Sequence, residues 1–131
     1  MSSMGGPPRP GTITWIDLTV QDADRLGDFY RSVTGWARDT LSIGDYHDFV
    51  MKDIDGQEVA GVCHARDGNA NVPAQWLVYI TVEDLDHSMS ECQRLGGAIV
   101  VPPRSYAGGR YCVIEDPAGA VCALYQPNDA A

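Results

Sequence analysis

Few side chains in this sequence have the type and spacing that chemistry requires. Two carboxylates, Asp17 and Glu58, stand in segments that are otherwise rich in apolar residues. A carboxylate in such a place can accept hydrogen bonds, meet a cation or act as a general base. The three histidines, His47, His64 and His87, lack the paired spacing of metal ligands, so a surface or structural role is expected for them.

The sequence offers no arrangement typical of a nucleophilic enzyme. It lacks a G-x-S-x-G turn, and the serines of its second predicted helix have no evident base beside them. Its four cysteines form no C-x-x-C pair and lie among apolar neighbours. This pattern favours small buried thiols in a reducing compartment, and the beginning of the sequence shows no secretory signal pattern. We therefore expect a cytoplasmic protein.

Composition limits the possible partners. The 131 residues suit one domain, and 18 acidic against 9 basic side chains give a formal charge of −9. This charge repels polyanions, so neither nucleic acid nor an anionic membrane is an expected partner. No apolar run reaches the roughly 18–20 residues that cross a bilayer. We predict a flexible tail over residues 1–11, a single domain over 12–127 and a short tail over 128–131.

An internal repeat organises this domain. Residues 15–24 match residues 77–86 at a shift of 62, and residues 50–60 match residues 113–123 at a shift of 63. One inserted residue accounts for the change of shift. The constant order of the matches predicts two equivalent modules, residues 12–66 and 74–127.

Each module is predicted to hold the order β-α-β-β-β. In the first module, Asp22 and Gly35 are the expected ends of a helix, and strands are expected at 12–20, 38–43, 46–53 and 58–65. In the second module a helix is expected from Asp84 to about Leu95, with strands at 76–82, 98–102, 110–115 and 120–126. The glycine-containing segment 104–111 is interpreted as a flexible rim loop, and an ordinary solvated turn is the competing interpretation.

Several short motifs, in this order, resemble the vicinal oxygen chelate superfamily, which includes glyoxalase I, extradiol dioxygenases and bleomycin-resistance proteins. The motifs are DLTVQD at 17–22, FY at 29–30, GW at 35–36, VEDLD at 82–86, LGG at 95–97 and DPAG at 116–119. The resemblance covers residues 12–127. It implies an α+β fold in which two tandem β-α-β-β-β modules form a U-shaped, eight-stranded mixed sheet with a cleft. It also implies a homodimer.

The resemblance also locates the positions at which metal-dependent relatives carry His or Glu. They lie five residues before the valine of each opening strand and four residues after the glycine of each closing hairpin, which here gives Trp15, Leu77, Ala60 and Ala123. Indole, isobutyl and methyl groups supply none of the donors that zinc, iron or manganese requires. We therefore expect no metal and no cofactor.

Strand alternation predicts which side chains line a metal-free cleft, because every second residue shares a face. The predicted ligand-binding residues are Trp15, Asp17, Glu58, Val62, Leu77, Tyr79, Val121, Ala123 and Tyr125. Their mixture of aromatic, small and acidic groups suits a planar or amphipathic organic ligand. Core packing is the competing interpretation for the aromatic residues, and a structural hydrogen-bond partner is the competing one for Asp17.

Three functional hypotheses remain open. The first is metal-independent binding of a small organic ligand, for sequestration or antibiotic resistance and without turnover. The second is a metal-free isomerase, epimerase or lyase in which Asp17 or Glu58 is the base. The third is a catalytically degenerate module that serves an interaction.

Overall fold

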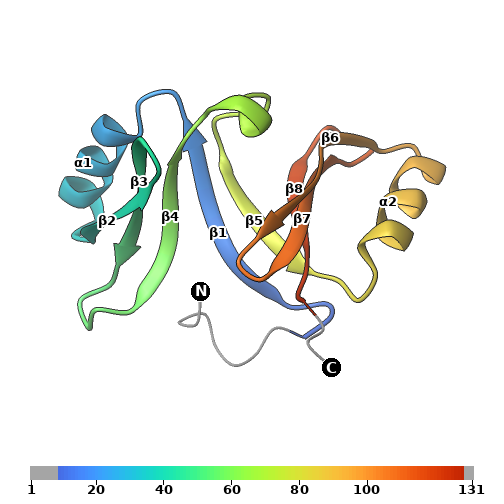
Figure 1. Ribbon diagram of the computed structural model, residues 1–131, viewed down its shortest axis with the longest axis horizontal. Coiled ribbons are helices and arrows are strands. Elements are labelled where there is room, and N and C mark those ends of the chain that lie inside the picture. Colours follow the sequence, from blue (N-terminus) through green and yellow to red (C-terminus); the bar gives the residue numbers. More distant parts are fainter. Residues whose placement is uncertain (1–8, 129–131) are drawn as a thin grey trace. The chain divides into compact units, whose positions relative to one another are not determined.

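The secondary structure repeats the same order of elements twice. A computed structural model describes residues 9–128, so the predictions for residues 1–8 and 129–131 lie outside the described part. The elements are β1 (Ile13–Val20), α1 (Ala23–Thr34), β2 (Ala37–Ile43), β3 (Tyr46–Lys52), β4 (Glu58–His64), η1 (Asp67–Asn69), β5 (Trp76–Thr81), α2 (Leu85–Arg94), β6 (Ala98–Tyr106), β7 (Gly109–Glu115) and β8 (Val121–Gln126) (Figure 1). The chain divides into two compact units, whose main bodies are residues 15–76 and the chain from residue 77 onward.

The first unit is a four-stranded mixed sheet with one helix on it. Its strands lie in the order β2-β3-β4-β1, and β1 runs parallel to β4 while the other two pairs are antiparallel. Helix α1 packs on β3 and β4. The buried core on that side consists of Ala23, Phe49, Met51, Ala60 and Val62. Burial of these apolar side chains fixes the helix on this face.

Helix α1 begins and ends at the predicted residues. The Asp22 side chain accepts a hydrogen bond from the Arg25 amide at 3.1 Å, and Gly35 ends the helix in the left-handed conformation. Not all of the apolar residues of α1 are buried, because Phe29 is 52% exposed and Val33 is 64% exposed. The stem of Arg38 takes the space beside Gly27, where a larger residue would clash with it.

The second unit repeats this arrangement. Its strands lie in the order β5-β8-β7-β6, with β5 parallel to β8 and the remaining pairs antiparallel. Helix α2 covers a core of Leu85, Cys112 and Leu124. The predicted α+β class, with two β-α-β-β-β modules and eight strands of mixed direction, is confirmed. Neither α1 nor α2, the two α-helices of residues 9–128, is long and apolar enough to cross a membrane.

The segment 104–111 is a hairpin, so the prediction of a flexible loop is wrong. Strand β6 continues to Tyr106 and β7 starts at Gly109, which leaves a turn of only Ala107 and Gly108, both at positive φ. The predicted strand ends at Pro102, whereas the observed strand runs past the two prolines at 102 and 103. They are tolerated because β6 is an edge strand whose register with β7 shifts between Val101 and Arg104.

Candidate functional site

Strand β1 carries a buried carboxylate on the sheet face opposite to the α1 core. Asp17 is only 4% exposed, and the indole N–H of Trp15 donates a hydrogen bond to its Oδ1 at 2.6 Å. Gly61 of β4 lies opposite Asp17, and a methyl group at Gly61 would overlap the carboxylate. The predicted common face of Trp15 and Asp17 is thus present, with glycine as the neighbour that makes room for the carboxylate.

A thiol stands beside this carboxylate. Cys63 is two residues beyond Gly61 on β4, opposite Thr19, which is itself buried. Burial raises the pKa of the Cys63 thiol well above its ordinary value, and the negative charges of Asp17 and Asp48 raise that pKa further. The thiol therefore stays protonated at neutral pH and is a poor nucleophile.

A β-bulge moves two predicted cleft residues to the other face of the sheet. The register between β3 and β4 shifts by one residue at Val59. Beyond this bulge Ala60 and Val62 face α1 and belong to its core, so the prediction that they share the face of Trp15 is wrong. In the observed register Gly61 is opposite β1, at the position where the sequence repeat predicts Ala60.

Glu58 lies before the bulge, at the start of β4. It is opposite Lys52 of β3 and is half-buried. A hydrogen bond to Asp39 raises the pKa of the partly buried Lys52 ammonium, and the charge of Glu58 adds to that increase. Glu58 thus has the Lys52 ammonium beside it at one end of β4, whereas Asp17 is opposite Gly61 in the middle of that strand.

The second unit presents a cluster of four tyrosines on the face opposite to α2. The ring of Tyr79 stacks on Tyr106 with centroids 5.7 Å apart and lies 5.8 Å from Tyr111, and Tyr106 lies 6.3 Å from Tyr125. The hydroxyl of Tyr125 donates to the carbonyl of Ala107 at 2.6 Å, and burial raises the pKa of that phenol.

Most of the predicted residues of the second module are on this same face. Leu77, Tyr79, Ala123 and Tyr125 are buried, and Ala123 is opposite Tyr79. Val121 starts β8 and is half-buried. Sequence reasoning missed Tyr106 and Tyr111 because both fall in the segment 104–111 that was interpreted as a loop, although the predicted strand 110–115 includes Tyr111; the signal was their position on either side of a short glycine turn.

The histidines contact carboxylates beside α1. Asp24 of the first helical turn is 3.4 Å from Nε2 of His47 and 3.7 Å from Nε2 of His64. The backbone N–H of His64 donates to Asp48 at 2.8 Å. The amide of His87 donates to Asp84, the N-cap of α2. The contacts of His47 and His64 connect α1 to its sheet and that of His87 caps the start of α2, which fits the structural role expected for the histidines.

The residues at the family's metal positions do not fit a divalent cation. Trp15, Leu77 and Ala123 carry no ligating atom, and neither Ala60 nor the glycine that replaces it in the observed register carries one. Within residues 9–128, no group of three or more His, Cys, Asp or Glu side chains is arranged to hold a metal ion.

Comparison with known families agrees with the fold. Residues 12–124 match the Glyoxalase/Bleomycin resistance protein/Dioxygenase superfamily. The protein belongs to this superfamily, as the motifs of its sequence suggest.

Curated relatives with quite different names match the chain. It is 32% identical over 123 residues to a putative glyoxylase, CFP32, of Mycobacterium tuberculosis; the matched region covers 92% of this chain and 47% of that protein. It is 31% identical over 130 residues to the anthracycline biosynthesis protein DnrV of Streptomyces peucetius, which covers 89% of this chain and 47% of that protein. The chain therefore spans about half the length of the curated relatives it matches.

Solved structures show the same fold at low identity. A methylmalonyl-CoA epimerase in complex with methylmalonyl-CoA and NH4+ matches with a TM-score of 0.56 at 14% identity, over 92% of this chain and 97% of that one. A glyoxalase/bleomycin resistance protein/dioxygenase superfamily member from Vibrio splendidus matches with a TM-score of 0.55 at 14% identity, over 86% of this chain and 96% of that one. At these identities the likeness concerns the fold alone.

Proposed function

We propose that this protein binds a small planar organic molecule without the help of a metal ion. The observation that carries the proposal is the pair of faces opposite to the helices. One holds the buried carboxylate of Asp17 beside the Trp15 indole, and the other holds the tyrosine cluster of Tyr79, Tyr106, Tyr111 and Tyr125. Aromatic side chains offer stacking area, and a carboxylate offers a partner for a cation or a hydrogen-bond donor.

The class of ligand follows from charge and from one relative. A net charge of −9 and a buried carboxylate favour a cation over an anion. The relative DnrV is named for anthracycline biosynthesis, and anthracyclines combine a planar ring system with an amino sugar. A planar aromatic amine of this type is therefore the ligand we propose, with sequestration or resistance as its use.

Daunorubicin, a fluorescent anthracycline, tests the proposal directly. We expect saturable quenching and a rise in anisotropy on addition of the purified chain, unchanged by EDTA. Replacement of Asp17 by Asn keeps the shape and the hydrogen bond from Trp15 while removing the charge, so we expect the dissociation constant to rise about tenfold. Asp55→Asn, which makes the same change of charge at an exposed turn of the same unit, is the matched control and should leave binding unchanged. Binding that requires added zinc, iron or manganese, or no saturable binding, overturns the proposal.

A metal-free acid–base enzyme is the second candidate, because a carboxylate as buried as Asp17 is suited to proton transfer. An isomerase, epimerase or lyase of this kind would use Asp17 as its base; Glu58, beside Lys52, is the less suitable base. The two candidates differ in one observation. If Asp17→Asn abolishes turnover of a substrate but leaves its dissociation constant unchanged, the carboxylate acts as a base and not as a ligand contact.

We propose further that two copies of the chain associate. Strand β2 ends the order of strands in its unit, and its Leu41 and Ile43 side chains are 48% and 36% exposed. An exposed strand edge with apolar side chains is suited to pairing with a second copy. Light scattering after size exclusion should give about twice the 14.2 kDa mass of the chain, and Leu41→Lys should return it to the monomer value. A monomer at all concentrations contradicts this proposal.

A further inference from the structure

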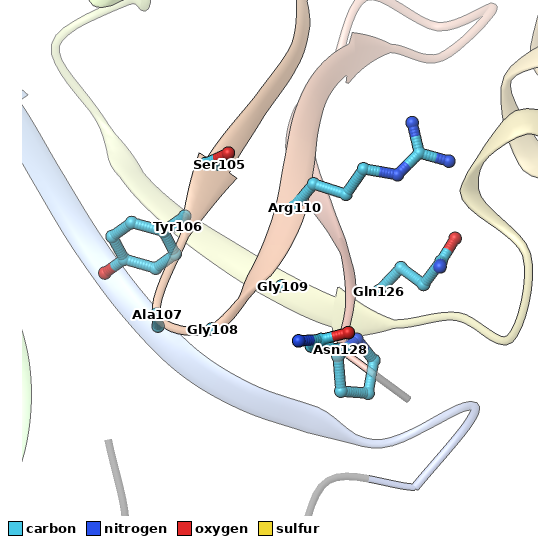
Figure 2. Close-up of a pocket in the computed structure, with 9 residues that line it drawn as sticks. Ser105, Tyr106, Ala107, Gly108, Gly109, Arg110, Gln126 and Asn128 are labelled. Atoms are coloured by element: carbon cyan, nitrogen blue, oxygen red, sulfur yellow. The ribbon is translucent and has the colours of Figure 1, made fainter. Parts of the chain in front are cut away.

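A polar pocket lies at the end of the second unit's sheet, beyond the first turn of α2. Its volume is about 570 Å³, and it is lined by Ser105, Tyr106, Ala107, Gly108, Gly109, Arg110, Gln126, Pro127 and Asn128 (Figure 2). This volume is in the range of small-molecule sites. None of these residues belongs to the ligand-binding set predicted from the sequence.

The pocket exists because α2 starts too late to cover the end of the sheet. Arg110 and Gln126 are opposite each other on β7 and β8, two residues beyond the pair Cys112 and Leu124 of the α2 core. They therefore share the helix-facing side of the sheet. Helix α2 begins at Leu85, whose backbone N–H donates to Gln126 Oε1 at 2.8 Å. Beyond this contact, Arg110 and Gln126 lie on the helix-facing side of the sheet but outside the apolar core that α2 covers.

Three neighbouring strands place a row of hydrogen-bond donors along this side. Ser105 of β6 is opposite Arg110, which is opposite Gln126, so a hydroxyl, a guanidinium and an amide stand side by side. Figure 2 shows the side chains of Arg110 and Gln126 extending to the same side of the hairpin, with Asn128 below Gln126. Because Gln126 Oε1 already accepts from Leu85, the amide NH2 of Gln126 is the group left for a ligand.

The backbone fixes this arrangement. Gly109 lies so close to the chain at 126–128 that a methyl group there would overlap the carbonyl of Gln126 and approach the amide of Asn128 to 2.9 Å. The hairpin end is therefore packed against the segment that carries the two amide side chains. The hydrogen bond from Tyr125 to Ala107 holds the turn from its other side.

The charge at the pocket is a guanidinium in contact with one exposed carboxylate. Arg110 Nη2 is 3.1 Å from Asp86 Oδ2, and the Asp86 side chain is 75% exposed. The first module has an equivalent contact, because Asp24 and His47 occupy the repeat positions of Asp86 and Arg110 and lie 3.4 Å apart. A clamp between helix and hairpin is thus common to both modules. The planar guanidinium of Arg110 and the amide of Gln126 have no counterpart of the same type in the first module.

We propose that this pocket is a second binding site, which takes a small organic carboxylate. A carboxylate is planar and can accept two parallel N–H bonds from a guanidinium while the amides of Gln126 and Asn128 bind its other lone pairs. Pro127 provides an apolar wall for the organic part of the ligand, whereas the Tyr106 ring extends away from Arg110 and Gln126 (Figure 2). In this site the ligand competes with the carboxylate of Asp86 for the guanidinium of Arg110.

Benzoate tests this site, with its neutral isostere benzamide as the control, in titrations followed by ¹H–¹⁵N spectra of the full chain. We expect saturable shifts at the amides of Gly108 and Gly109 and at the Arg110 Nε signal. Benzamide should bind about tenfold more weakly, and sodium chloride at equal ionic strength should give no saturable shift. Equal binding of benzoate and benzamide, or benzoate shifts confined to other parts of the protein, overturns the proposal.

Two variants separate a ligand site from a structural clamp. Asp86→Asn removes the competing carboxylate and should tighten benzoate binding about threefold to tenfold, a change that a clamp alone does not produce. Asp24→Asn is the matched control: it alters net charge equally at the equivalent position of the first module and should leave benzoate binding unchanged. Arg110→Gln should weaken binding about tenfold in a variant whose spectrum remains folded. If Asp86→Asn and Asp24→Asn have the same effect on benzoate binding, the proposal fails.

Discussion

The indole N–H of Trp15 donates to the carboxylate of Asp17, two residues further along the same strand, at 2.6 Å. Both residues are buried, at 3% and 4% exposure. A buried carboxylate requires such donors, because loss of a hydrogen bond to a charged group inside a protein leaves its desolvation uncompensated. This pair therefore connects the stability of the first unit with the face proposed to bind a ligand.

Replacing Trp15 by Phe keeps the aromatic bulk and removes the donor. We expect the free energy of unfolding to fall by about 1–3 kcal/mol, measured by urea denaturation. Trp76→Phe is the control, since that indole N–H donates to a neutral partner, the hydroxyl of Tyr30, at 3.1 Å. It should cost about 0.5–1.5 kcal/mol. Equal losses in the two variants would show that the Trp15 bond to Asp17 has no special weight.

Gly61 is expected to be required only as long as Asp17 is present. Gly61→Ala places a methyl group onto the carboxylate, so we expect a loss of about 1–3 kcal/mol in the free energy of unfolding. In the double variant with Asp17→Ala the obstacle is gone, and the cost of the Gly61 substitution should largely disappear. A double-mutant cycle measures this coupling. Strictly additive losses would contradict the predicted overlap.

The sequence predicts the modules well and the local register less well. Capping residues such as Asp22 and Gly35 act over a few neighbouring positions. The helices and their ends can therefore be predicted from the sequence. The bulge at Val59 leaves no such signal. One extra residue in β4 reverses the faces of Ala60 and Val62, although the sequence on either side alternates as expected.

The polar pocket escaped prediction for a related reason. Its residues come from β6, β7 and β8 and become neighbours only through strand pairing, and Ser105 and Arg110 were assigned to a loop. The predicted strand ends at Pro102, but β6 continues past both prolines because at a sheet edge the missing N–H of a proline costs little. By contrast, the common face of Trp15 and Asp17 follows from alternation within one strand and was predictable.

The thiol of Cys112 should make stability depend on alkaline pH. Burial raises its pKa from an ordinary value of about 9 to about 12 in the folded protein. The unfolded chain therefore loses this proton first, so the stabilisation is complete below about pH 9 and is lost as pH rises toward 12. We expect urea midpoints to fall between pH 8.5 and 10.5 more steeply in the natural protein than in Cys112→Ala. Parallel pH profiles of the two proteins would contradict the burial of this thiol.

The turn at Ala107 should be improved by glycine. Ala107 has a φ of 48°, a left-handed conformation in which a Cβ atom is unfavourable, and the hydrogen bond from Tyr125 to its carbonyl holds it there. Ala107→Gly relieves this strain at the cost of a more flexible unfolded chain, so we expect a net gain of about 0.5–1 kcal/mol in thermal or urea unfolding. Gly108→Ala is the reverse experiment, because Gly108 has a φ of 81° with open space around it. It should lose about 1–2 kcal/mol, and a loss in both variants would mean that contacts of the Ala107 methyl group outweigh the backbone strain.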